Sequence, residues 1–559
     1  MTQMNSQSTE PRVVSKYRMR WMVTALLVLA AGLYLSLLHN QLGDIVTDSH
    51  LYLVLAKALA TGHGFRDIHL PGQPPEITVP FLFPLLLSVV MRITPTALWP
   101  LHLLVVVHLW LALWCGWRWL RHSDGTWLGV LALGCTILNP RIAEWSLVLV
   151  PIFPYLGYSL AAFLAVRRYV ASPRVLDRWY WATLSCVLAA TFLWLPGLVL
   201  CAAAVMAVLT SGEDSLRWRK ARLLALGCAL PIGAWCLRGL WVQHEQANTL
   251  LQPFYAISGS TTYWRTMAYE TWFDPASPWV GWRMLGQRCV EGALFYGETI
   301  ARYLYIGTIV PIGWALVAAA VIGWGARCRR GITMAEWSVV GYLALQALNP
   351  FRLERYVLPV LPLCYAYALW GIHASLRAIR GLTAAQAWWP RWQMRWLGRA
   401  LGVGVLVIVL TPAIEEVVWR VRVHHTPLRL PGQTTTVNWA QFLERRYWAV
   451  HPDQLLAIND FFELHAWVRT HDPSRAVIFS TMPRLSAWLS SHEALRFPMK
   501  AREDGLLRMA DRVGARYVIT TEANVLMELY HRPPVQEFLG RCELIQRRPF
   551  GALYRVVRH

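Results

Sequence analysis

The sequence has few cysteines, and none of them lie in paired motifs. Its 559 residues include ten Cys, with no CxxC pair and no spacing typical of a metal site. Most lie inside apolar blocks, and only Cys289 and Cys542 fall in segments that we expect to face an oxidising compartment. We interpret both as unpaired, so the sequence predicts no disulfide framework.

Acidic residues are also scarce. The chain has 53 Lys and Arg but only 32 Asp and Glu, which gives a formal net charge of +21. This excess does not indicate nucleic-acid binding, because the basic residues punctuate the apolar blocks and form no single basic face. The C-terminal part lacks a GxGxxG motif, a P-loop and a nucleophile elbow. We therefore expect no nucleic-acid partner and no nucleotide-sugar site.

Long apolar blocks are what the sequence does have. Hydrophobic residues make up 56% of the chain, and 31 Trp suit a protein with many membrane interfaces. The blocks are about 17–25 residues long, enough for a helix to cross the hydrocarbon core. The first, Trp21–Leu38, has no small-residue cleavage site, so we expect it to be retained. We predict about eleven transmembrane helices, at 20–39, 98–118, 126–140, 146–166, 179–194, 197–209 (after a turn at Pro196-Gly197), 222–241, 303–325, 334–349, 356–376 and 400–419.

The loops between these spans differ in charge. Most basic residues fall on one side, and the short loops of the other side hold only Arg141, Arg352 and Arg355. The positive-inside rule then predicts a multi-pass protein of the cytoplasmic (inner) membrane with a cytoplasmic N-terminus. We expect a transmembrane domain over 1–420, with long outside loops at 40–97 and 242–302, and a periplasmic or extracellular α/β domain over 421–559.

The C-terminal region has the pattern of a small α/β domain. Short apolar runs rich in β-branched residues occur at 476–480 (AVIFS), 516–521 (RYVITT) and 552–557 (ALYRVV). Helical patterns at 460–471 and 502–515 alternate with them. This alternation predicts a parallel or mixed sheet.

The strongest site signal is TDSHLYLVLAKALATGHGF, which follows the first span. A helix that starts near Asp48 places Asp48, Tyr52 and Ala56 on one face, next to a stripe of leucines. We expect an amphipathic helix along the outer interface, with Asp48 as a general base toward a hydroxyl or amine. The alternative is that Asp48 only caps the helix.

A second signal is NPFRLERYVLPVLPL, at the outside start of the tenth predicted span. Arg352 and Arg355 lie where lipid headgroups would be, and an Arg fork binds phosphate well. Tyr356 follows directly, and the alternative is that all three only anchor the helix at the interface. Lys57 is a third candidate phosphate ligand, and Glu144 in NPRIAEW is a candidate second acid.

Three histidines, His50, His63 and His69, share the first long loop. Their spacings of 13 and 6 match no common zinc site. We therefore expect no cofactor, while a divalent metal held by other residues stays an open alternative.

Together these features resemble the GT-C class of polyprenyl-phosphate-sugar-dependent glycosyltransferases, and within it the bacterial relatives of protein O-mannosyltransferases and lipid A aminoarabinose transferases. The resemblance rests on Asp48, Tyr52, Ala56 and Gly62, on the proline-marked ITVPFLFPLLLSVV, and on RLERYVLPVLPL. It implies a helical membrane bundle with a small outside α/β domain. It also implies that Asp48 is the catalytic acidic residue and that Arg355 and Tyr356 bind the carrier phosphate.

The chain departs from that family pattern at two places. Many members carry an Asp-Glu pair in the first loop, whereas Ser49 follows Asp48 here. Many also carry an acidic residue around the third and fourth spans, where this chain is apolar near Ile152 and has Glu144 eight residues earlier. We therefore expect the groups that activate the acceptor to differ from those of the family.

The resemblance implies an inverting sugar transfer from a polyprenyl-phosphate carrier to a lipid, glycan or protein acceptor. The reaction would take place at the outer face of the cytoplasmic membrane. Arg355, Arg352 and Lys57 would stabilise the departing phosphate, and the second long loop, including Tyr263, would cover the donor. One alternative is a transporter or flippase for a lipid-linked substrate, which the few mid-span charges and the lack of internal repeats disfavour. The other is a non-catalytic membrane scaffold, which the departures at Ser49 and Ile152 favour.

The charge asymmetry of the loops makes a testable prediction about sidedness. A reporter fused after Arg420 should report a periplasmic or extracellular location, and one fused after Arg330 a cytoplasmic one. Alkaline phosphatase and green fluorescent protein fusions at each position measure this directly. The reverse pattern would overturn the topology and the outside position of both site signals.

Overall fold

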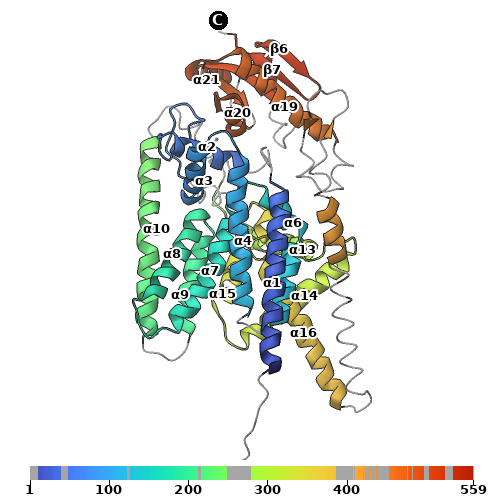
Figure 1. The fold of residues 1–559 in the computed structure, drawn as a ribbon. Coiled ribbons are helices and arrows are strands. Elements are labelled where there is room, and N and C mark those ends of the chain that lie inside the picture. The colour runs from blue at the N-terminus through green and yellow to red at the C-terminus, as the bar shows by residue number, and fades with distance from the viewer. Residues whose placement is uncertain are drawn as a thin grey trace, which may run out of the picture.

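The structure is a computed structural model. It describes residues 10–38, 48–121, 126–211, 216–247, 278–385, 404, 407, 410–419, 421, 428–429, 436–437, 452–474, 476–480, 482–495, 503–522 and 533–557. Within these ranges the chain forms a bundle of long helices that carries a small α/β domain at one end (Figure 1). The predicted pairing of a helical bundle with a C-terminal α/β unit is therefore confirmed, while the exact boundary at 420–421 stays a prediction.

Long helices at ten of the eleven predicted spans build the bundle. They are α1 (Glu10–Ser36), α4 (Trp99–Arg121), α5 (Thr126–Ile137), α7 (Ile152–Val170), α8 (Arg178–Leu193), α9 (Gly197–Thr210), α10 (Arg217–Ala247), α14 (Val310–Cys328), α15 (Met334–Leu348) and α16 (Leu361–Ala385). By length and composition, four of the described helices (α1, α4, α10 and α14) are able to cross a membrane. The eleventh span, 400–419, lies largely outside the described residues, so the number of spans remains a prediction.

Proline explains where two helices start later than predicted. The span predicted at 303–325 begins at Val310, with Pro311 in its first turn, and residues 303–304 end the preceding helix α13 (Trp282–Leu304). The span predicted at 356–376 begins as a 3-10 helix, η1 (Glu354–Val357), before α16 starts at Leu361. Proline is tolerated in the first turn of a helix but not in its interior. The turn predicted at Pro196-Gly197 is confirmed, since α8 ends at Leu193.

The C-terminal domain has a five-stranded mixed sheet in the order β4-β3-β5-β7-β6. Its strands are β3 (Val477–Ser480), β4 (Glu493–Leu495), β5 (Ala515–Thr521), β6 (Glu543–Arg548) and β7 (Gly551–Arg555). Strand β3 runs parallel to β4 and β5, whereas β7 is antiparallel to β5 and β6. The helices are α19 (Pro452–His471), α20 (Pro483–Ser490), α21 (Glu503–Val513) and α22 (Pro533–Gly540), and two-residue strands β1 (Leu428–Arg429) and β2 (Thr436–Val437) precede them. The mixed sheet is as predicted.

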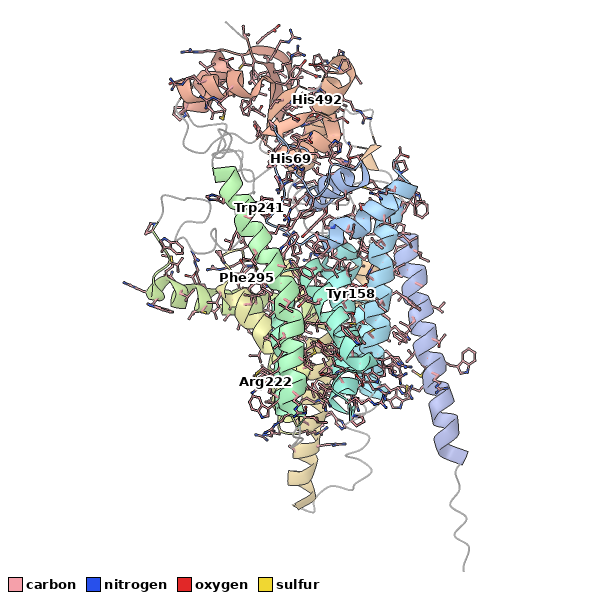
Figure 2. All side chains as sticks on the ribbon, turned by 90° about the vertical axis from the view of Figure 1, so that its left-hand side faces the viewer. His69, Tyr158, Arg222, Trp241, Phe295 and His492 are labelled. Atoms are coloured by element: carbon pink, nitrogen blue, oxygen red, sulfur yellow. The ribbon has the colours of Figure 1, made fainter. Side chains whose placement is uncertain are left out.

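The first long loop joins the bundle to the C-terminal domain. Leu70 of this loop is fully buried in the same apolar cluster as Phe479 of β3. The backbone N–H of Ala494 in β4 donates a hydrogen bond to the carbonyl oxygen of His69, at 2.8 Å. Figure 2 shows His69 at this junction, below His492 of the domain. The loop therefore supplies part of the core and one edge contact of a domain that lies about 400 residues later in the sequence.

Helix α2 (Ser49–Ala60) lies at the centre of this junction (Figure 1). The sequence predicts an amphipathic helix with one face at the membrane interface, and this prediction is wrong. Most α2 residues are buried, because α3 (Leu82–Ile93) packs on one side and α20 of the C-terminal domain on another. The ammonium of Lys57 lies 5.7 Å from the ring centre of Trp488 in α20. A covering domain so distant in sequence leaves no signal in the local pattern.

Two glycines allow α14 and α16 to cross closely. A Cβ at Gly323 of α14 would overlap the carbonyl oxygen of Tyr367, and one at Gly371 of α16 would overlap that of Ala319. Small residues at such crossings let helix backbones approach inside membranes.

We therefore expect Gly323→Ala to lower the thermal unfolding temperature of the purified protein, because overpacking typically costs about 1–3 kcal/mol. Gly325 is the matched control, since a Cβ there meets nothing within 4 Å. Gly325→Ala should leave the unfolding temperature unchanged or raise it slightly, as Ala favours helix by up to about 1 kcal/mol. Equal effects of the two variants would contradict the close crossing.

Candidate functional site

Two residues predicted from separate motifs meet at the end of the bundle near the C-terminal domain. The Nη2 atom of Arg355 donates to Oδ2 of Asp48 at 2.8 Å, although 307 positions separate them. Asp48 stands at the N-cap position of α2, but its side chain makes no capping hydrogen bond. Its carbonyl oxygen accepts the N–H of Tyr52 instead. The Asp48 carboxylate is therefore used for the ion pair, which answers the capping alternative.

The two partners differ in exposure. The Arg355 side chain is 10% exposed and that of Asp48 is 50% exposed. Charges attract more strongly where protein replaces water around them, so the buried guanidinium holds its half of the pair firmly. The Asp48 carboxylate is the half that an incoming molecule can reach.

Aromatic rings hold the guanidinium of Arg355. Its Cζ lies 5.8 Å from the ring centre of Trp145 and 5.6 Å from that of Tyr356, within the range of cation–π attraction. Tyr356 is itself fixed, because its ring packs 5.5 Å from that of Trp194 and its carbonyl oxygen accepts the hydroxyl of Tyr342 at 2.8 Å. The η1 turn therefore presents Arg355 in one orientation.

Trp145 comes from α6 (Pro140–Ser146), whose local sequence explains its position. The Asn139 side chain caps the helix and Pro140 opens it, a combination favourable at a helix start. The Nδ2 of Asn139 also donates to the carbonyl oxygen of Tyr303 at 2.8 Å, which ties α6 to α13. Sequence reasoning missed Trp145, although it directly follows the candidate acid Glu144.

Tyr52 contributes a hydroxyl beside the ion pair. It is buried, with its ring edge-on to Phe83 at 5.1 Å. Burial raises its pKa well above the usual range, the negative charge of Asp48 raises it further, and Arg355 opposes the shift. The hydroxyl therefore stays protonated and neutral.

Three other predicted residues have contacts of their own. Glu144 accepts a hydrogen bond from Arg141 at 3.0 Å, within α6. Arg352, in the segment before η1, pairs with Glu291 of α13. Lys57 lies against α20, as described above, and Tyr263 falls outside the described residues. The structure thus brings together Asp48, Tyr52, Arg355 and Tyr356 from the predicted set, and gives Glu144, Arg352 and Lys57 other neighbours.

A buried acidic cluster that the sequence analysis did not single out lies in the same loop. Arg484 of α20 approaches Oδ2 of Asp67 at 3.4 Å and Oε2 of Glu76 at 3.8 Å. His69 Nδ1 lies 3.3 Å from Oδ1 of Asp67, and the backbone N–H and hydroxyl of Thr78 donate to Oε1 of Glu76. We call Asp67, Glu76 and Arg484 the junction cluster.

The junction cluster holds a proton. Burial and the neighbouring Asp67 together raise the pKa of Glu76 to about 8, although Arg484 acts in the opposite direction. At neutral pH the Glu76 carboxyl is therefore protonated and hydrogen-bonded to Asp67, which leaves one carboxylate opposite one guanidinium.

The sequence predicts no metal site among the histidines of the first loop, whose surroundings the structure describes. In the described ranges, no group of three or more His, Cys, Asp or Glu side chains is placed to hold a metal ion. His63 instead contacts the hydroxyl of Thr61, at 2.8 Å from its Nδ1.

Comparison with known proteins relates this fold to solved structures. No protein-family model matches the sequence, and no curated protein matches it. The structure of ArnT from Cupriavidus metallidurans in the apo state matches with 11% identity and a TM-score of 0.57, over 96% of this chain and 98% of ArnT. The same ArnT bound to undecaprenyl phosphate matches with 12% identity and a TM-score of 0.55, over the same shares of the two chains, 96% and 98%.

A third match is the oligosaccharyltransferase AglB from Archaeoglobus fulgidus in complex with an inhibitory peptide and a dolichol-phosphate. It has 11% identity and a TM-score of 0.52, over 90% of this chain and 69% of AglB. These neighbours are glycosyltransferases of the GT-C class, and the chain shares their fold along nearly its whole length. The predicted likeness to GT-C membrane proteins is confirmed at the level of the fold.

The geometry of the ion pair predicts a measurable coupling. A double-mutant cycle of Asp48→Asn and Arg355→Gln should give a coupling free energy of about 1 kcal/mol or more in thermal unfolding, since one partner is nearly buried. The pair Arg352 and Glu291, exposed by 35% and 41%, is the matched control. Its cycle should give under about 0.5 kcal/mol, as is common for exposed pairs. No coupling between Asp48 and Arg355 would contradict the pair.

Proposed function

We propose that this protein transfers a sugar, with inversion, from a polyprenyl-phosphate carrier to a lipid, glycan or protein acceptor. The observation that carries the proposal is the Asp48–Arg355 pair, at the end of a GT-C-like bundle, with the carboxylate exposed and the guanidinium held by aromatic rings. Two structural neighbours were solved with undecaprenyl phosphate or dolichol-phosphate bound, which supports a lipid-linked donor. We place the reaction at the outer face of the cytoplasmic membrane, on the side of the C-terminal domain.

Arg355 would bind the phosphate of the donor. A phosphate oxygen competes with the Asp48 carboxylate for the guanidinium, and a planar fork is able to contact both anions. The aromatic rings of Trp145 and Tyr356 keep this fork in place before the donor arrives, so little order has to be created on binding. The hydroxyl of Tyr52 is a further donor beside the pair.

Asp48 would activate the acceptor. Its exposed carboxylate takes the proton of an acceptor hydroxyl or amine while the oxygen or nitrogen attacks the anomeric carbon from the face opposite the phosphate. The bond between the anomeric carbon and the phosphate oxygen breaks, and its electron pair leaves with the phosphate. Arg355 stabilises that departing charge, which is greater in the transition state than in the bound donor.

The remaining candidates have supporting roles in this proposal. Arg352, which precedes η1 and pairs with Glu291, is the candidate for a second phosphate contact. Lys57 and Glu144 remain candidates, although their contacts with Trp488 and Arg141 favour structural roles. The cover of the donor by the loop around Tyr263, the lack of a cofactor and the cytoplasmic N-terminus stay predictions.

The test is Asp48→Asn in purified, folded protein. Asn keeps the size of the side chain, and no capping hydrogen bond is lost because Asp48 makes none, but Asn does not accept a proton near neutral pH. We expect turnover to fall by roughly 10²-fold or more, the scale of general-base catalysis. The assay follows consumption of polyprenyl-phosphate sugars from a lipid extract by mass spectrometry.

Asp177→Asn is the matched control. Asp177 is also an N-cap aspartate, and its side chain does accept hydrogen bonds from the N–H groups of Trp179 and Tyr180. Asp177 caps α8 and is not part of the Asp48–Arg355 pair, so Asp177→Asn should keep its turnover. Near-normal transfer by folded Asp48→Asn would remove Asp48 from the mechanism. Consumption of no lipid-linked sugar by the wild-type protein would favour the scaffold or the transporter.

A further inference from the structure

The junction cluster links the C-terminal domain to the helix that carries Asp48. Its acids, Asp67 and Glu76, belong to the first loop, and its base, Arg484, stands in the first turn of α20. Helix α20 packs directly on α2. The domain therefore touches α2 both through helix packing and through an ion pair with the loop that follows α2.

Arg484 interacts electrostatically with the acids of the junction cluster and with Asp48 of the candidate site. Burial lowers the pKa of Arg484, but the neighbouring acids Asp67, Glu76 and Asp48, all ionised at the high pH where an arginine titrates, outweigh burial and raise it. Tyr52 is in turn influenced by Asp48, by Arg355 and by Glu76. The junction cluster and the Asp48–Arg355 pair thus lie within electrostatic reach of each other, and the pKa of Tyr52 responds to both.

We propose that Arg484 is a positioning residue for the candidate site: by pairing with Asp67 and Glu76 it fixes the C-terminal domain on the first loop and thereby holds the first turn of α2, which carries Asp48. The catalytic meaning of that position rests on the proposed function. The position itself does not, because it can be measured without turnover.

The charges around Glu76 give the junction a pH dependence. The groups that act on it are Asp67 from its own loop, Arg484 from α20, Tyr52 from α2, and Arg238 of α10, whose Nη1 donates to the carbonyl oxygen of Glu76 at 3.1 Å. His69 contacts Asp67 in turn. Burial and Asp67 raise the pKa of Glu76 above that of an exposed Glu carboxyl, so the packed junction favours the protonated form. Its stabilisation is complete below the ordinary pKa of a Glu carboxyl and is lost as pH rises toward the raised value.

Hydrogen–deuterium exchange on the full-length protein tests the proposal. Two amides are informative: that of Ala494, bonded to the carbonyl oxygen of His69, reports docking, and that of Tyr52, bonded to the carbonyl oxygen of Asp48, reports the first turn of α2. Arg484→Gln should speed exchange at both amides by about tenfold, and Arg484→Lys should restore part of the protection. Glu76→Gln mimics the protonated carboxyl, so it should keep the protection and remove its loss as pH rises from the ordinary Glu pKa of 4.5 to about 8, after correction for intrinsic exchange.

Arg516→Gln is the matched control, because Arg516 is an arginine of the same domain that also pairs with a carboxylate, Asp472, at 3.0 Å. It should change neither amide. Faster exchange at Ala494 with an unchanged Tyr52 would overturn the positioning role, since Arg484 would then only hold the domain. Unchanged exchange at both would overturn the pairing as well.

Turnover separates this inference from the proposed function. If the enzyme is active, Arg484→Gln should lower kcat more than it raises KM, because the donor contact Arg355 is intact while Asp48 is displaced. Normal kcat in a variant with a loosened α2 would refute the positioning role. If the wild type consumes no lipid-linked sugar, the proposed function fails, while the exchange results still decide whether Arg484 holds α2.

Discussion

The contact between Asp48 and Arg355 depends on support from both ends of the chain. Asp48 is held because α2 is packed between α3 and a domain from the C-terminal end of the sequence. Arg355 is held because a short 3-10 turn, forced by the prolines that follow, places it between two aromatic rings. Neither support is local to the other. The exposed carboxylate and the guanidinium thus come from segments that distant parts of the chain support.

Charge neutrality shapes this end of the molecule. Ionised groups are costly to bury unless each is matched by a partner. The structure meets that condition because burial and the neighbouring Asp67 raise the pKa of the Glu76 carboxyl, so that one carboxylate faces the Arg484 guanidinium at neutral pH. The exposed Asp48 lies close by, and its charge is matched by that of Arg355.

Local patterns predicted much of the fold and the centre of the site. Apolar blocks located ten of the long helices, and the strand-like runs located β3, β5 and β7. Helix spacing and a short arginine motif identified Asp48, Tyr52, Arg355 and Tyr356, whose signals each span a few residues. The misses share a cause. Arg484 meets Asp67 across 417 positions, and no periodicity reports a contact of that range.

Two further misses have physical reasons of a different kind. Helix α13 was assigned to a loop, because its exposed and buried faces mix polar and apolar residues and no long apolar block results. The cover on α2 was missed, because a helix buried by two unrelated elements has the same sequence pattern as one with a lipid-facing side. The sequence therefore did not predict how distant segments pack around one another. That packing distinguishes an acid that pairs with Arg355 from one that only caps a helix.

The insertion of Leu70 into the apolar cluster of the C-terminal sheet bears on how the chain is made. A ribosome releases the first loop long before the strands that will surround Leu70 exist. The sheet domain is synthesised after the bundle, and one residue of its apolar core, Leu70, belongs to a loop of that bundle. Maturation of the tail is thereby coupled to correct insertion of the helices before it, and a chain whose early segments are misthreaded offers its tail no complete core. Burial of Leu70 thus makes packing of the C-terminal core depend on the position of the first loop.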